Sequence, residues 1–300
     1  MPPEEQTTQN PKTVALLGAG GTMGRGMGVN LAAAGFGVRA WNRTADKIGD
    51  LADRDGVEVC ESPREAAAGA DVVLTMLSDG DAVLAAVEGA DGALADARAD
   101  SIWLQASTIG LEATARCAEL AAEAGVILVD APVLGTKKPA EEGQLVILGS
   151  GPEQAREQLQ PLFDAIGKRT LWAGEAGAGS RLKVAVNSWI VSVVEGTAEM
   201  LALAEAVGID PRMTLDAVAD GPLDLPYMRL KAKAMLEGDF TPSFRLSLAA
   251  KDAGLALDAA EQAGLALPML EAIRERMDAV AEEHGDEDLA AVYLASSANA

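Results

Sequence analysis

Histidine is almost absent from this chain of 300 residues, where it occurs only as His284, in a polar run near the C-terminus. Hydrolases with a Ser-His-Asp triad, zinc sites with several histidines and dehydrogenases that use a His–Asp pair all need histidine elsewhere. Cysteine is nearly as scarce, because Cys60 and Cys117 are too few for a disulfide framework or a cysteine-rich metal centre. We therefore predict no metal site and expect both thiols to be reduced.

Basic residues are also in short supply, since 24 lysines and arginines face 46 acidic residues and give a formal net charge of -22. Such a field repels polyanions, and the densest basic cluster (Arg229, Lys231 and Lys233) is small. No apolar run reaches transmembrane length, and the polar start of the chain is unlike a signal or transit peptide. We expect a disordered tail over 1–11, a cytoplasmic protein, and neither nucleic acid nor a membrane as partner.

The first half of the chain alternates short β-branched runs with alanine-rich helical stretches, which is typical of a parallel sheet with crossover helices. Beyond Gly179 nearly everything has a helical period, starting with a long, mostly apolar helix from Ser180 to about Ala206. We predict an α/β fold, with a doubly wound sheet over 12–176 and an all-α domain over 177–300 built on the long helix between them. Strands are expected at Thr13–Leu17, Gly37–Trp41, Val57–Cys60, Asp71–Met76, Ser101–Gln105, Val126–Asp130 and Leu145–Gly149.

A glycine-rich turn follows the first expected strand and precedes a helix. Gly18 allows the tight turn, Gly20 lets the backbone approach a pyrophosphate, and the helix offers its first N–H groups near Thr22 and Met23. The third glycine, Gly24, comes one place later than the usual spacing. The motif predicts dinucleotide binding, and on this motif alone a glycine turn without a ligand stays open.

The end of the second expected strand indicates which dinucleotide binds. An NAD site usually carries an acidic residue there, whereas this chain has Trp41-Asn42-Arg43-Thr44. Arg43 can stack on adenine and pair with a 2′-phosphate, and Asn42 and Thr44 can donate hydrogen bonds to it. The alternative is a solvated surface arginine, but its place one strand after the glycine loop favours NADP(H).

Several separate motifs, spread from about Lys12 to Tyr293, resemble the β-hydroxyacid dehydrogenase family, which includes 3-hydroxyisobutyrate dehydrogenases. They are Met23-Gly24 with Met27, Asn30 and Leu31; Ser107-Thr108; Asp130-Ala131-Pro132-Val133 with Gly135 and Gly143; Gly177-x-Gly179-x-x-x-Lys183-x-x-x-Asn187; and Lys251-Asp252. The chain is most similar to the glyoxylate/succinic semialdehyde reductase branch through Trp41–Thr44, Cys60–Pro63, Met76–Asp79 and Thr136–Leu145. The resemblance implies a Rossmann domain, NADPH as cofactor, a helical substrate and dimerisation domain, and a homodimer or tetramer.

The resemblance also implies roles for individual residues. It assigns substrate binding to Ser107, Thr108, Gly135, Thr136 and Phe244, and cofactor contacts to Leu77, Ser78, Lys251 and Asp252. Ordinary turns, a core aromatic and a solvated lysine are the structural alternatives. Leu134 stands where the family usually has serine, which removes a hydroxyl from the substrate loop.

Hydride transfer to a carbonyl needs a proton donor at the oxygen, and with histidine confined to position 284 a lysine is the obvious candidate. Lys183 lies in an apolar stretch, with Asn187 four residues on and therefore on the same helix face. Partial desolvation makes an ammonium a better acid near neutral pH. From spacing alone, a lysine extending from a buried helix to solvent is an equal alternative. The resemblance implies that Lys183 donates the proton and that Asn187 orients it or shares the oxygen.

The resemblance and the residues together predict an NADPH-dependent reductase of a small aldehyde or keto acid, such as glyoxylate or succinic semialdehyde. The reverse reaction is oxidation of a 3- or 4-hydroxy acid. Imine reductases are one alternative, and Leu134 would suit their less polar substrates, but they usually lack the lysine found here at Lys183. A non-catalytic binding member of the family is the other alternative, against which the presence of Lys183, Asn187, Ser107 and Lys251 argues.

Overall fold

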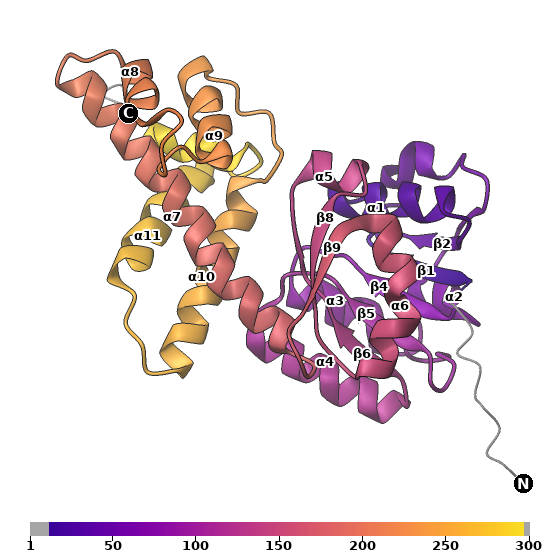
Figure 1. Cartoon of the computed structure of the whole chain (residues 1–300). Coiled ribbons are helices and arrows are strands. Elements are labelled where there is room, and N and C mark those ends of the chain that lie inside the picture. The colour runs from indigo at the N-terminus through magenta and orange to yellow at the C-terminus, as the bar shows by residue number, and fades with distance from the viewer. Residues whose placement is uncertain (1–11, 297–300) are drawn as a thin grey trace, which may run out of the picture. The chain divides into compact units, whose positions relative to one another are not determined.

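The protein is described from a computed structural model, which covers residues 12–296. The tail predicted over 1–11 lies outside the described residues. The chain divides into two compact units, residues 1–183 and 184–300, and the division falls within helix α7 (Ala178–Ala206). Figure 1 draws both units, which are taken in turn below.

Six parallel strands form the main sheet of the first unit, in the order β3-β2-β1-β4-β5-β6. The order reverses between β1 and β4, and such a switch point leaves a crevice at the carboxyl ends of the strands, where dinucleotides bind in doubly wound folds. The predicted fold class is confirmed, and the strands agree with the prediction to within two residues: β1 (Thr13–Leu17), β2 (Gly37–Trp41), β3 (Val57–Val59), β4 (Val72–Thr75), β5 (Ile102–Gln105) and β6 (Ile127–Asp130).

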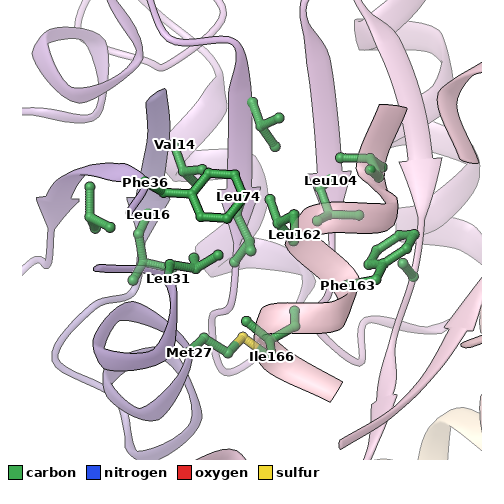
Figure 2. Packing of buried hydrophobic residues seen from close by; sticks show 14 of the residues in the cluster. Val14, Leu16, Met27, Leu31, Phe36, Leu74, Leu104, Leu162, Phe163 and Ile166 are labelled. Carbon is green, nitrogen blue, oxygen red and sulfur yellow. The ribbon is translucent and has the colours of Figure 1, made fainter. Parts of the chain in front are cut away.

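Alternating side chains along the central strands build two cores, one on each face of this sheet. Val14 and Leu16 of β1 pack with α1 (Thr22–Ala33) and α6 (Glu153–Ile166), and Figure 2 shows this core around Met27, Leu162 and Ile166. Ala15 and Leu17 pack on the other face. The helices there are α2 (Pro63–Ala67), α3 (Gly80–Val87) and α4 (Gly110–Ala124).

The strand predicted at Leu145–Gly149 was expected to extend the doubly wound sheet, and this was wrong. It is β8 of a second sheet with the order β7-β8-β9, in which β7 is Val133–Leu134 and β9 is Gly167–Trp172. Only two residues separate β6 from β7, too few for the crossover that a parallel neighbour needs. The chain therefore leaves the main sheet, and β8 pairs antiparallel with β7 across α5 (Lys137–Glu141).

The second unit is all-helical, as predicted, and three of its helices have proline at one of their first two positions, where no N–H is needed. Lys231, a member of the densest basic cluster of the sequence, is buried in α9, at 2% exposure. Within residues 12–296 no helix is long and apolar enough to cross a membrane. Besides α7, the elements are α8 (Pro211–Val218), α9 (Pro226–Glu237), α10 (Leu246–Gln262), α11 (Pro268–His284) and the 3-10 helix η2 (Leu289–Ala295).

Helix α7, predicted as a long and mostly apolar helix, is only partly buried in the single chain. One stripe is buried, including Val191, Val194 and Leu201, whereas Trp189 is 62% exposed and Leu203 is 64% exposed. A single chain thus leaves large apolar side chains of this helix in contact with water.

Candidate active site

The loop between β1 and α1 is shaped for the close approach of its backbone to a ligand. Gly18 has a φ of +100°, and a Cβ atom there would collide with the carbonyl oxygen of Met76. Between Gly18 and Gly24 the loop has one residue more than the usual glycine spacing. A tight turn accommodates it, in which the N–H of Gly21 donates to Gly18 O at 3.0 Å. Gly24 then packs against Gly18 O, where a Cβ would not fit. The late third glycine therefore still provides the close contact between helix and strand that this type of loop needs.

Helix α1 begins directly after this turn. Its N-cap residue, Gly21, offers no side chain, so the N–H groups at Thr22 and Met23 have no side-chain cap. Uncapped N–H groups at the positive end of a helix suit a phosphate. The glycine cradle and the uncapped helix end together fit the pyrophosphate of a dinucleotide.

The loop after β2 is tied to the glycine loop by Asn42. Its Oδ1 accepts from the N–H of Gly20 at 3.2 Å, and its Nδ2 donates to Thr44 O at 2.8 Å. A Cβ on Gly20 would lie 2.7 Å from Asn42 Cγ, so glycine is required there. The structure thus gives Asn42 a role in holding two loops together, beside the exposed residues Arg43 and Thr44.

Lys47 was not predicted and lies next to this site, in the 3-10 helix η1 (Ala45–Leu51). A Cβ on Gly20 would be 2.8 Å from Lys47 Cβ. Among the described residues neither Arg43 nor Lys47 has an acidic partner within ion-pair distance. The signal that could have identified Lys47 is its spacing of four from Arg43 at the start of a helical segment.

A buried polar network joins the carboxyl ends of β4 and β5. Ser107 is fully buried; its Oγ accepts from the N–H of Leu77 at 2.9 Å and donates to Thr75 O at 3.2 Å. Gln105 fixes the backbone of Ser107 through two hydrogen bonds of 2.8 Å. A hydroxyl has one proton to donate, so the Ser107 hydroxyl is already committed in this arrangement. Ser78 follows Leu77 and donates to Asp79, which caps α3.

The start of α7 is anchored by the carboxylate of Asp130, at the end of β6. It accepts from the N–H and the hydroxyl of Ser180 at 2.8 and 2.7 Å and from the hydroxyl of Ser150 at 3.2 Å. Burial raises the pKa of Asp130, and these donors oppose that effect. Gly179 fits this junction because a Cβ there would lie 2.9 Å from Asp130 O.

Lys183 lies one turn further along α7 and is 9% exposed. Its Nζ donates to Val133 O at 2.8 Å, three residues after Asp130. The short segment from Asp130 to Val133 therefore holds both the first turn of α7 and the ammonium of its lysine. The motifs predict a substrate loop that begins with this segment.

Asn187, four residues after Lys183 on the same helix, is hydrogen-bonded within the second unit. Its Nδ2 donates to Asp252 Oδ2 of α10 at 2.6 Å, and both residues are buried. Lys251 Nζ lies 3.0 Å from the other oxygen of Asp252. Three residues predicted at separate places of the site are thus neighbours.

The remaining predicted residues occupy loops. Gly135 has a φ of +131°, and a Cβ there would lie 2.8 Å from Leu145 Cδ2, so the loop after β7 depends on glycine. Thr136 starts α5 without a side-chain cap, and Thr108 follows Ser107 before α4. Phe244 is half-buried in the second unit, where its N–H donates to Asp288 at 3.2 Å.

A cluster of possible metal ligands lies beside β3, where single ligand atoms of Glu58, Cys60 and Glu65 are within 4.8 Å of one another. Arg39 occupies the same place, with its Nε 3.3 Å from Glu58. Burial raises the pKa of the Cys60 thiol, which keeps it protonated. A protonated thiol beside a guanidinium is a poor cation site.

A switch-point crevice, a glycine loop before an uncapped helix and a buried lysine define a dinucleotide-dependent oxidoreductase. Two family models match the chain. One is described as the NAD binding domain of 6-phosphogluconate dehydrogenase and covers residues 13–174. The other is described as NAD-binding of NADP-dependent 3-hydroxyisobutyrate dehydrogenase and covers residues 177–295.

Individual relatives agree with these models. The chain is 33% identical over 288 residues to glyoxylate/succinic semialdehyde reductase 2, chloroplastic, of Arabidopsis thaliana, which covers 95% of this chain and 80% of the relative. It is 34% identical over 262 residues to reductase 1 of the same plant, covering 87% and 90%. The solved structure of Mycobacterium tuberculosis 3-hydroxyisobutyrate dehydrogenase with L-serine has a TM-score of 0.85 and 30% identity, covering 95% of this chain and 99% of that one.

The chain belongs to the 3-hydroxyisobutyrate dehydrogenase-like family of NAD(P)-dependent β-hydroxyacid dehydrogenases. The family and enzyme class predicted from the motifs are thereby confirmed.

Proposed function

We propose that the protein is an NADPH-dependent reductase of a small aldehyde or keto acid, with Lys183 as the proton donor. The observation that carries this proposal is the buried ammonium of Lys183, held 2.8 Å from Val133 O beside the predicted substrate loop. The names of the two plant relatives support glyoxylate and succinic semialdehyde as substrates. The L-serine in the mycobacterial structure is itself a 3-hydroxy acid, which supports the reverse reaction on that class.

Each role follows from the chemistry of carbonyl reduction. The bound cofactor supplies a hydride to the carbonyl carbon, and negative charge then develops on the carbonyl oxygen. Lys183 offers a proton to that oxygen, while its hydrogen bond to Val133 O fixes the side chain. In the reverse direction the neutral amine accepts the proton of the alcohol. Backbone N–H groups of the loop at Gly135 and Thr136 are proposed to hold the substrate carboxylate.

The preference for NADPH rests on Arg43 and Lys47. Arg43 lies in the loop after β2, where NAD enzymes usually carry an acidic residue, and Lys47 lies in η1, which follows that loop. A guanidinium and an ammonium suit a 2′-phosphate. Asn42 supports them by tying their loop to Gly20.

The test is oxidation of NADPH with a panel of glyoxylate, succinic semialdehyde, other short keto acids and a cyclic imine. We expect turnover of an aldehyde or keto acid, reduced by about 10²- to 10⁴-fold in Lys183→Ala, because that is the usual contribution of a general acid. Lys168→Ala, at an exposed lysine of β9, is the control and should behave like the parent. Turnover of imines alone would support an imine reductase, and binding of NADPH without any turnover would support a non-catalytic member.

A homodimer or larger assembly is proposed for the second unit, because large apolar side chains are exposed there in the single chain. Surfaces of this kind usually meet a partner. Sedimentation velocity measures the assembly directly. The exposed side chains are Trp189, Leu203, Val207, Ile209, Met213, Leu223, Leu230, Leu265 and Met269.

A further inference from the structure

The pair formed by Asn187 and Asp252 has a feature that a simple structural contact does not explain. Asn187 is 2% exposed and Asp252 is 5% exposed, and their hydrogen bond is 2.6 Å long. Asn187 Oδ1 is also buried, yet it has no hydrogen-bond partner among the described residues. A buried acceptor without a donor is unfavourable, so such an atom calls for an explanation.

The orientation of the carboxamide follows from the chemistry of its neighbour. An ionised carboxylate can only accept hydrogen bonds, so the amide nitrogen of Asn187 must face Asp252 and the amide oxygen must point away. Lys251 Nζ lies 3.0 Å from Asp252 Oδ1, so a cation borders the other oxygen of the same carboxylate. The side chain of Asn187 therefore cannot turn over without bringing two oxygens together.

We infer that Asp252 is a positioning residue, which fixes Asn187 so that Oδ1 is presented as an acceptor at the reaction site. This rests on the proposed function. The partner of Oδ1 is an N–H or O–H donor. Two sources share that chemistry: the ammonium of Lys183, one turn earlier on α7, and a donor group of the bound ligand. In either case Asn187 does not act by donating its amide N–H to the carbonyl oxygen.

Reversing the pair tests this inference. Asn187→Asp alone places two carboxylates in contact, whereas Asn187→Asp with Asp252→Asn restores one donor and one acceptor in exchanged positions. The exchanged pair still presents an oxygen from position 187, but it has no N–H there. Asp252→Ala removes the positioning group, and Asp258→Asn, at an exposed acid of α10, is the control for a change of charge on that helix.

The first measurement needs neither cofactor nor substrate. The urea midpoint should fall in Asn187→Asp and recover in the double variant, while Asp258→Asn leaves it unchanged. A single variant as stable as the parent would show that the pair does not form, and this would overturn the inference. These stability measurements test the pair even if the parent reduces no compound of the panel. That result would contradict the proposed function alone.

The second measurement is the steady-state reduction rate. We expect kcat to fall by about tenfold or more in Asp252→Ala and Asn187→Asp with a smaller change in KM, and to recover by about tenfold in the double variant. If Lys183 is the donor, the carboxylate at position 187 moves the alkaline limb of kcat/KM to higher pH. If the ligand is the donor, the limb stays and the KM of the ligand changes. A double variant that regains stability but stays as slow as Asn187→Asp would show that the N–H of Asn187 is what the reaction needs.

Discussion

The ion pair of Lys231 and Asp288 is buried in the second unit, and Asp288 also accepts from the N–H of Phe244. We expect removal of Asp288 to destabilise this unit more than removal of Lys231. Lys231 Nζ lies 2.5 Å from Asp288 Oδ1, and the two side chains are 2% and 4% exposed. Besides the lysine, the carboxylate accepts from the N–H and hydroxyl of Ser243 and from the N–H groups of Phe244 and Ala290. The ammonium has fewer alternatives: Ser243 Oγ at 3.3 Å and the Tyr227 ring at 5.3 Å.

Removal of one partner of a buried ion pair costs about 3–5 kcal/mol. Lys231→Met leaves a carboxylate that keeps four donors, so the lower end of this range, about 3 kcal/mol, is expected. Asp288→Ala leaves a nearly unpartnered ammonium and also deprives those four donors of their acceptor. The upper end, about 5 kcal/mol, is therefore expected for Asp288→Ala.

Acid should weaken the same pair. Burial alone would raise the pKa of Asp288, but Lys231 and the surrounding donors outweigh it and leave the pKa below its ordinary value. The carboxylate therefore stabilises the fold above the ordinary aspartate pKa of about 3.9, and this contribution is lost as the pH falls below that value. Lys231→Met should flatten this part of the stability profile.

Urea unfolding followed by circular dichroism measures both variants, with Lys233→Met on the exposed side of the same helix as control. The transition of the second unit should move, while that of the first unit stays. The reasoning would be refuted by Lys231→Met costing more than Asp288→Ala, or by either substitution costing less than about 1 kcal/mol.

Two further predictions concern the first unit. Arg43→Asp should raise the dissociation constant of NADPH by about 10- to 100-fold and that of NADH little, because one charged hydrogen-bond partner of the 2′-phosphate is lost. Fluorescence titration measures both dissociation constants. The control, Arg169→Asp on β9, should change neither of them. Asp130→Ala should destabilise the fold by about 3 kcal/mol and slow the reaction, because Ser180 loses the acceptor of two buried hydrogen bonds; Asp130→Asn, which keeps one oxygen, should cost less on the same urea curve.

The main sheet could be predicted because its strands are short apolar runs bounded by glycine and polar turns. The second sheet could not, since β7 has two residues and β9 carries the polar sequence Gly-Lys-Arg-Thr, neither of which stands out from a loop. Helix α6 was also missed, and it contains Pro161, an ordinary signal against a helix interior.

For the candidate site, the identities of the residues could be predicted, whereas the contacts between them could not. Lys183 and Asn187 could be predicted as site residues through the family resemblance of their motif, whereas their spacing alone left the role of Lys183 open. The contacts that hold them could not be predicted, because tertiary structure brings Val133 O to Lys183, Asp252 to Asn187 and, at the start of the same helix, Asp130 to Ser180. The burial of Lys231 could not be predicted for the same reason: it stands between Arg229 and Lys233 in the sequence, and its partner, Asp288, comes from a distant part of the chain.

The acidity of the chain strengthens the cofactor proposal. Most arginines among the described residues lie within ion-pair distance of a carboxylate, which cancels much of their charge locally. Arg43 is an exception, as are Arg54, Arg169 and Arg181, and Lys47 also has no carboxylate within ion-pair distance among the described residues. Of these, Arg43 and Lys47 border the glycine loop. In a protein with a net charge of -22, an anionic cofactor is repelled from most of the surface. No carboxylate of the described residues lies within ion-pair distance of Arg43 or Lys47, and this supports the proposal that they attract a 2′-phosphate.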